Sequence, residues 1–351
     1  MNPLELVPMI AQGGRNMPKT ILRSSWALAL LAGLLAPGAF AAQTPGASNG
    51  SNGPAMALHD GVVVDAAAGA AYVMSSRGGI DAIDLTSGNV MWKSRDAAKP
   101  LLLKGGTLLA QAQPDRAGKL AVVALDAKRG TATRRVDLDI PSGVRAQVFD
   151  GPSQSFKVTA FSAADGAVVA WTAEDGRSLQ GLLPPESEGA PTESKAAAVR
   201  VVAEPLHGAA RLDLATGRAV PMAYEKAMGL RTPDVAEKAR ASSDPSRLTS
   251  LDGRHVLHSE PSAEGNLLTA YRWTLTNAAG KRIGTVEAPV GMAPFVVSGS
   301  RVLYVAQPSA YRVEGKLVQQ PLRLVALDLK TGGELWSAML ADSAYRGPFP
   351  P

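Results

Sequence analysis

The residues that could bind a metal ion are few, and their spacing argues against a shared site. The histidines of the chain are His59, His207, His255 and His258. The last two would be neighbours on a helix, but RHVLHSE favours a strand, where residues three apart face opposite sides. Asp137 and Asp139 share a strand face, yet they lack the glycine and glutamate positions of a calcium loop. We therefore predict no metal-binding residue.

Nucleophilic catalysis also lacks a signature. The sequence has no cysteine, which excludes a cysteine nucleophile, a thiolate metal site and a disulfide. It has no Gly-x-Ser-x-Gly elbow either, and Ser298-Gly299-Ser300 indicates a hairpin turn between apolar strands. Gly105-Gly106 precedes a strand rather than the helix that a phosphate cradle needs. We predict no catalytic and no cofactor-binding residue.

A repeated pattern of Asp, Gly and Trp organises the chain instead. The two complete copies are Asp84, Gly88 and Trp92, and Asp328, Gly332 and Trp336. In each copy the Asp ends an alternating apolar strand, where its carboxylate can accept backbone N–H groups of a turn. The Gly can adopt the left-handed conformation of that turn at little steric cost. The Trp, in the next strand, is expected to pack between repeat units.

Four further turns keep part of the pattern. The copies that retain the Asp are Asp126 with Gly130 and Asp213 with Gly217, and those that retain only the glycine are at Gly176 and Gly280. Arg134 and Pro221 stand in the Trp position of the first two. The six glycines recur at intervals of roughly 40 to 60 residues, close to the length of a propeller blade.

The pattern A-[IL]-D-x-x-[TS]-G-x-x-x-W resembles the pyrroloquinoline-quinone-type β-propeller repeat. Proteins with this repeat include the quinoprotein alcohol dehydrogenases and the propeller lipoprotein of the outer-membrane barrel-assembly machine. The resemblance implies an all-β propeller with one four-stranded blade per repeat and the Trp wedged between neighbouring blades. We predict about six blades, with seven as the alternative.

Quinone chemistry is not expected to accompany the repeat. In the dehydrogenases the resemblance implies a larger propeller, a vicinal disulfide over the quinone, and a calcium ion held by carboxylate and amide groups. This chain has no cysteine, and no blade has a clear Glu, Asn and Asp set. The prediction is therefore that the protein uses no cofactor.

The N-terminus has the features of a secretory signal peptide. Lys19 and Arg23 precede an apolar run at 26–36, and Ala39-Phe40-Ala41 is a small-x-small cleavage site. The run is shorter than the roughly 20 residues that span a bilayer, so an uncleaved anchor is the alternative rather than the prediction. We expect translation to start at Met17 and the mature protein to be periplasmic or secreted, without a lipoprotein cysteine.

The remaining boundaries follow from composition. Gly, Ser and Asn enrichment without an apolar period indicates a flexible linker, and the Pro-rich C-terminus indicates an extended tail. The predicted order is a signal peptide at 1–41, a linker at 42–55, a β-propeller at 56–341 and a tail at 342–351.

The longest insertion between repeats, 222–247, is the candidate interaction loop. Thr232-Pro233-Asp234 combines an N-cap, a Pro at the first helical position and an acidic first turn, which predicts a short exposed helix. Loops on a rigid scaffold frequently carry recognition. Tyr224, Arg231 and Arg240 give this loop residue types that are enriched at interfaces.

These observations favour a non-enzymatic periplasmic scaffold that binds other envelope proteins as a monomer, with envelope assembly as the role that the resemblance suggests. The formal net charge of +5 is modest, and with an address outside the cytoplasm it does not favour nucleic acid. No transmembrane segment is expected after signal cleavage. The alternative function is a small-ligand binder or an enzyme that uses the mouth of the propeller channel.

The first testable expectation is cleavage after Ala41, because the small side chains of Ala39 and Ala41 fit the specificity of a signal peptidase. Mass spectrometry of the protein released from the periplasm should give Ala42, or a close neighbour, as the first residue. An intact N-terminus recovered with the membrane fraction would contradict this expectation.

Overall fold

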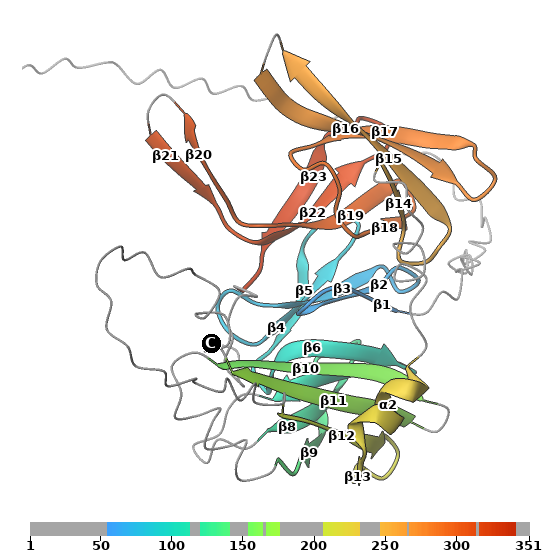
Figure 1. Cartoon of the computed structure of the whole chain (residues 1–351), viewed down its shortest axis with the longest axis vertical. Coiled ribbons are helices and arrows are strands. Elements are labelled where there is room, and N and C mark those ends of the chain that lie inside the picture. The colour runs from blue at the N-terminus through green and yellow to red at the C-terminus, as the bar shows by residue number, and fades with distance from the viewer. Residues whose placement is uncertain are drawn as a thin grey trace, which may run out of the picture. The chain divides into compact units, whose positions relative to one another are not determined.

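The computed structural model describes residues 55–112, 120–140, 154–163, 166–175, 206–231, 246–264, 267–313 and 316–341. In these ranges the chain folds into five successive antiparallel sheets of four or five strands, one two-stranded hairpin and one helix (Figure 1). We refer to the sheets as blades 1 to 5. The predicted signal peptide, most of the linker and the tail lie outside the described residues.

The blades consist of strands that follow one another along the chain. Blade 1 contains β1 (Met56–His59), β2 (Val62–Asp65), β3 (Ala70–Met74), β4 (Ile80–Asp84) and β5 (Val90–Ser94). Blade 2 contains β6 (Ala97–Lys104), β7 (Thr107–Ala112), β8 (Ala121–Asp126) and β9 (Ala132–Asp137). Blade 3 contains β10 (Gln154–Ala163), β11 (Gly166–Asp175), β12 (Leu206–Asp213) and β13 (Arg218–Met222).

The second half of the chain continues in the same way after the helix α2 (Tyr224–Leu230). Blade 4 contains β14 (Arg247–Thr249), β15 (His255–Glu264), β16 (Leu267–Asn277) and β17 (Arg282–Ala288). Blade 5 contains β18 (Phe295–Ser298), β19 (Arg301–Ala306), β22 (Arg323–Asp328) and β23 (Glu334–Met339). Between β19 and β22 the hairpin β20 (Ser309–Val313) and β21 (Lys316–Gln320) extends from the blade (Figure 1).

This arrangement is an all-β propeller, and its described part contains five blades for the six turn glycines of the sequence. The difference arises in blade 3. Gly176 directly follows β11 and lies outside the described residues, whereas Gly217 lies between β12 and β13. Strands β11 and β12 pair with each other, so the described residues on either side of 176–205 belong to one sheet.

Burial along the strands follows their place in the blade. Strand β19 is buried at five of six positions and β2 at three of four, as expected for strands packed on both faces. The outermost strands β9 and β23 alternate between exposed and half-buried residues, because only one of their faces packs against a neighbouring blade. Valine, leucine and alanine therefore dominate the inner strands.

The core consists of clusters that join successive blades. Separate clusters join blade 1 to blade 2, blade 2 to blade 3, blade 4 to blade 5, and blade 5 back to blade 1. Among the described residues no cluster joins blade 3 to blade 4. Instead α2 packs on blade 3, where Ala227 is fully buried against Val168, Ala170 and Ala209 (Figure 1).

The four Asp residues of the repeat organise their turns in the same way. Asp84 Oδ1 accepts the backbone N–H groups of Thr86 and Ser87 at 2.9 and 2.7 Å. Gly88, with φ of +73°, closes the turn by donating its N–H to the Asp84 carbonyl at 2.8 Å. Equivalent carboxylate and glycine bonds form at Asp126, Asp213 and Asp328.

Hydrogen bonds lower the pKa of three of these carboxylates, those of Asp84, Asp213 and Asp328. The backbone N–H and then the hydroxyl of Ser87 lower the pKa of Asp84. The Thr216 hydroxyl lowers the pKa of Asp213 in the same manner, and the Lys330 N–H lowers that of Asp328. The ionised side chain is thus the form that caps the turn.

Side chains from the outermost strand of one blade cover the glycine turn of the next. The Trp336 ring of blade 5 lies over Gly88 of blade 1, and its indole N–H donates to the Leu85 carbonyl at 3.3 Å. Trp92 covers Gly130 and donates to the Ala127 carbonyl at 3.0 Å. These contacts connect blade 5 to blade 1 and blade 1 to blade 2.

Arg134 takes the place of the Trp between blades 2 and 3. Its side chain lies over Gly217, and its Nη1 donates to the Ala215 carbonyl at 2.5 Å. The planar guanidinium therefore supplies both the flat surface and the donor that an indole supplies elsewhere. In the corresponding turn of blade 4, no atom of the described residues lies within 4 Å of where a Cβ on Gly280 would be, so none of them makes this contact there.

We expect Gly88→Ala to destabilise the protein by about 2–4 kcal/mol. A left-handed Ala costs about 1 kcal/mol, and a Cβ at this position would lie 2.5 Å from Trp336 Cγ, which adds an overpacking cost of about 1–3 kcal/mol. Gly280→Ala is the matched control, since its φ of +78° is similar but the space around it is open. It should cost only about 1 kcal/mol in urea unfolding. Equal losses in the two variants would show that the Trp336 contact contributes nothing.

Candidate functional site

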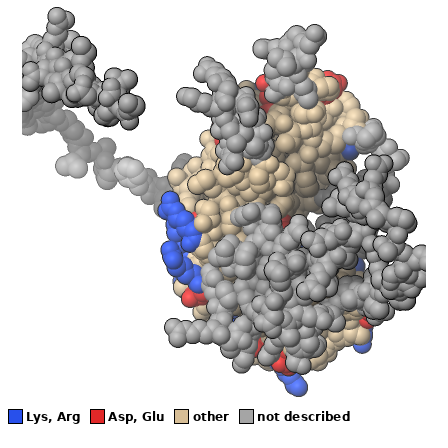
Figure 2. All heavy atoms as spheres, turned by 60° about the vertical axis from the view of Figure 1, so that its left-hand side comes forward, with Lys and Arg blue, Asp and Glu red and all other residues tan. Residues whose placement is uncertain are grey.

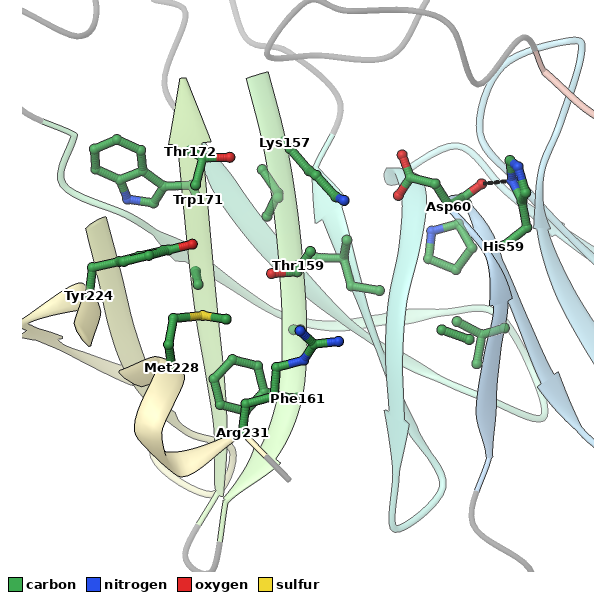
Figure 3. Close-up of a pocket in the computed structure, with 18 of the residues that line it drawn as sticks. His59, Asp60, Lys157, Thr159, Phe161, Trp171, Thr172, Tyr224, Met228 and Arg231 are labelled. Atoms are coloured by element: carbon green, nitrogen blue, oxygen red, sulfur yellow. Dashed lines mark hydrogen bonds between the residues drawn. The ribbon is translucent and has the colours of Figure 1, made fainter. Parts of the chain in front are cut away.

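A recess of about 560 Å³ opens beside blade 3 (Figure 3). Its wall is formed by β10, β11 and α2 on one side and by residues of blades 1 and 2 on the other. In Figure 3, Lys157, Thr159 and Phe161 follow one another along β10, and Tyr224, Met228 and Arg231 follow one another along α2 and its C-terminal end. Asp60 lies opposite them in the turn after β1, with His59, the last residue of β1, beside it.

Strand alternation determines which β10 side chains reach the recess. Phe156 and Val158 are buried against blade 2. Lys157, Thr159 and Phe161 are on the opposite face, because successive side chains of a strand alternate. This second face is the one that α2 covers in part.

Strand β11 pairs with β10 and adds its own side chains to the same face. Lys157 pairs with Thr172, Thr159 with Ala170, and Phe161 with Val168. Opposed side chains in antiparallel strands lie about 5 Å apart at their Cβ atoms. The face therefore has a polar row at Lys157 and Thr172 and an apolar row at Phe161 and Val168.

Helix α2 is held at its first turn by blade 3. The Tyr224 ring packs on the His207 ring with centroids 4.4 Å apart, and His207 Nε2 lies 3.1 Å from Glu225 Oε1. The backbone N–H of Glu225, followed by His207, lowers the pKa of the Glu225 carboxyl. With Ala227 buried one turn later, these contacts fix the side of the recess that α2 provides.

The charged groups of the recess differ in whether they have partners. Asp60 forms an ion pair of 2.6 Å with Lys99, which is mostly buried. His59 Nδ1 donates to the Asp60 carbonyl at 2.9 Å. Lys157 is exposed, and its ammonium group has no hydrogen bond or ion pair with any residue in the described ranges.

The hydroxyl groups of Thr159 and Thr172 also lack partners within the described part of the chain. Together with Lys157 they provide hydrogen-bond donors beside the apolar side chains of Phe161 and Met228. This composition suits a ligand that has one anionic group and one apolar group. We did not predict from the sequence that β10 forms part of a site. The available signal was KVTAF at 157–161, in which Lys157, Thr159 and Phe161 stand at every second position and so share one strand face.

The predicted interaction loop is only partly an exposed loop. Tyr224 and Arg231 lie at the two ends of α2 and both line the recess, whereas Arg240 and the expected helix start at 232–234 lie outside the described residues. The helix that is described begins earlier, at Tyr224, without a side-chain cap at Ala223. It forms there because Ala227 and Met228 are apolar and pack on blade 3.

One group in blade 4 combines a serine, an aspartate and a histidine. The Ser250 hydroxyl, which is fully buried, donates to Asp252 Oδ1 at 2.5 Å and accepts the His255 backbone N–H at 3.0 Å. Both hydrogen bonds of the Ser250 hydroxyl therefore lie within the turn before β15. His255 Nδ1 is 3.7 Å from Asp252 Oδ1, so the group stabilises a turn and does not present a nucleophile.

The described residues contain neither a candidate metal-ion cluster nor a candidate membrane-spanning helix. Within them, no three His, Cys, Asp or Glu side chains come together in a way that could hold a metal ion. None of their helices has the length and apolar composition that a membrane crossing requires.

Comparison with known proteins gives matches to structures only. No protein-family model matches the sequence, and no curated protein matches it. Among solved structures, BamB from Moraxella catarrhalis is 15% identical, with 72% of this chain and 69% of that chain covered and a TM-score of 0.24. A europium-containing methanol dehydrogenase is 13% identical, with 78% and 67% covered and a TM-score of 0.22.

A third match is the Cps50 (Swd1) β-propeller domain of Myceliophteria thermophila, 13% identical over 79% of this chain and 85% of that one, with a TM-score of 0.23. Identities and scores this low support no argument about function. The class of the protein follows from its own blades and turns: it is a β-propeller whose repeat resembles the pyrroloquinoline-quinone type.

The turn at Asp252 gives a pH-dependent prediction. Burial would raise the pKa of this carboxyl, but the nearby His255 side chain and hydrogen bonds from the Ser250 hydroxyl and the Arg254 N–H outweigh it and lower the pKa to about 2. A carboxyl with a lowered folded-state pKa stabilises the protein above its ordinary pKa of 3.8, and the contribution is lost as the pH falls toward 2. Because the group is partly exposed, we expect about 1–2 kcal/mol at pH 7.

The measurement is urea unfolding of the wild type and of Asp252→Asn between pH 7 and pH 2.5. The variant should be less stable at pH 7, and the difference should shrink below about pH 4. A difference that stays constant over this range would mean that the carboxylate charge does not stabilise the turn.

Proposed function

We propose that the protein is a non-enzymatic propeller scaffold of the cell envelope that binds another envelope protein at blade 3 and α2. The observation that carries the proposal is the incomplete cover of one blade face. In the described residues a single short helix packs on this face of blade 3, whereas the other blades pack on one another.

The surroundings of α2 support a protein partner. Leu230 at the end of the helix is 46% exposed, and Val220 on the adjacent strand β13 is 48% exposed. Arg231 follows directly, and Tyr224 lines the recess beside it. Exposed apolar residues together with Tyr and Arg are the composition found at protein interfaces.

The periplasmic location and the envelope partner rest on the N-terminal signal sequence. Figure 2 shows a face on which Lys and Arg side chains gather at one margin rather than across the surface. We do not propose a nucleic-acid partner, because the predicted signal peptide would place the protein outside the cytoplasm. We propose that the scaffold acts as a monomer.

A small-ligand binder is the second candidate, and the volume of the recess favours it. About 560 Å³ is within the range of pockets that bind small molecules. The two candidates differ in what would contact Leu230, because a ligand inside the recess would leave this exposed residue in water.

The experiment is site-specific photo-crosslinking in living cells, with the benzophenone amino acid p-benzoylphenylalanine replacing Leu230. We expect one discrete adduct larger than the protein itself. The same substitution at Lys281, an exposed residue in the turn between β16 and β17, is the control and should give none.

Adducts of equal yield at both positions, or none at position 230, would contradict a partner at α2. In the second case, stabilisation of the purified protein by a small metabolite would favour the ligand-binding candidate.

A further inference from the structure

We propose that the β10 side of the recess binds an extended peptide segment with an acidic residue followed four positions later by a large apolar residue. The inference rests on the proposed scaffold function and specifies what the partner presents. Its basis is the line of three side chains, Lys157, Thr159 and Phe161, along one face of β10 (Figure 3).

The positive charge of Lys157 suits the β10 side of the recess, which we call the seat, to an anionic group. Lys157 is the lining residue whose cation has no partner in the described ranges, while the Asp60 carboxylate is already paired with Lys99 at 2.6 Å. A ligand anion would therefore gain an ion pair without displacing one. Thr172, which is opposite Lys157 in register, and Thr159 add hydroxyl donors on either side of the ammonium group.

A carboxylate fits these donors better than a phosphate group does. Phosphate sites use bidentate arginines or a nest of backbone N–H groups to balance their higher charge. At the Lys157 end of the recess the donors are one ammonium group and two hydroxyls, and the guanidinium of the recess, Arg231, lies at the other end beside α2. One ammonium group and one carboxylate balance each other in charge.

The apolar end of the seat determines the spacing in the ligand. Phe161 is half-buried and packs with Met228 and Tyr224 of α2 on the same buried cluster, so it offers an apolar surface at the opposite end from the carboxylate position. Lys157 and Phe161 are four residues apart in a strand, which corresponds to about 13 Å. An extended peptide has the same repeat, so its residues at i and i+4 face one side at the same distance.

The spacing of about 13 Å between Lys157 and Phe161 also distinguishes a peptide ligand from a small free carboxylic acid. A small carboxylate such as 3-phenylpropionate is shorter than about 13 Å and cannot occupy both ends at once. A peptide bridging both ends would gain the ion pair and the apolar contact in one binding event. The geometry therefore points to a segment of a protein partner.

The test is calorimetric titration of the mature protein with acetyl-Gly-Asp-Gly-Ser-Gly-Leu-Gly-amide, in which Asp and Leu are four positions apart. The same peptide with Asn in place of Asp, and a peptide with Leu three positions after Asp, are the controls. We expect saturable binding of the first peptide and at least tenfold weaker binding of both controls. Lys157→Met should weaken the first peptide at least tenfold, since it keeps the stem and removes the charge.

Lys281→Met, which removes an exposed charge in blade 4, should leave the affinity unchanged. Binding that tolerates Asn, or that survives in Lys157→Met, would overturn the proposed seat. Equally tight binding of 3-phenylpropionate would overturn the peptide assignment in favour of a small carboxylate.

The outcome can be separated from that of the scaffold proposal. If crosslinks at position 230 form but no peptide binds, the partner contacts α2 by other chemistry and this inference is wrong. If the peptide binds and no crosslink forms, the carboxylate seat stands and the assignment of a partner at α2 fails.

Discussion

The contact between a flat side chain and a glycine turn of the next blade connects most of this structure. Trp336, Trp92 and Arg134 each cover a glycine with positive φ and donate a hydrogen bond to a carbonyl of the same turn. The glycine is needed twice, for the backbone conformation and for the close approach. Burying an aromatic side chain in this way also removes a large apolar area from water.

Among the described residues no such contact joins blade 3 to blade 4, and the structure differs there from the other blade junctions. Blade 3 has Pro221 at the Trp position, and the Gly280 turn of blade 4 is open. The face of blade 3 beyond this point carries α2 and the recess in place of another described blade. The same erosion of the repeat that weakens its sequence signal thus coincides with the surface that we propose for recognition.

The sequence predicted the fold class because the repeat records physical requirements locally. Asp, Gly and Trp at fixed spacing specify a carboxylate-capped turn, a left-handed residue and a packing surface, and each can be read without tertiary information. The number of blades depends on more than the repeat, because Gly176 lies outside the described residues, which form five blades. The pairing of β11 with β12, which joins the segments on either side of 176–205 into one sheet, is information that no turn signature carries.

The candidate site was predicted only in part. Tyr224 and Arg231 were recognised from residue type, and both line the recess. Lys157 and Thr172 were not recognised, because their proximity depends on strand register. Arg134 was taken as the loss of a Trp, although its guanidinium makes the equivalent contact. In each of these cases the missing information is which residues of distant segments face one another.

The most direct test of the central claim is hydrogen–deuterium exchange of the mature protein, alone and in complex with the envelope protein that it captures. The account predicts slower exchange on binding in peptides that cover 154–163 and 224–231, with the turns at 84–88 and 328–332 unchanged. Slower exchange confined to those turns, with no change in β10 or α2, would contradict the assignment of blade 3 and α2 as the recognition surface.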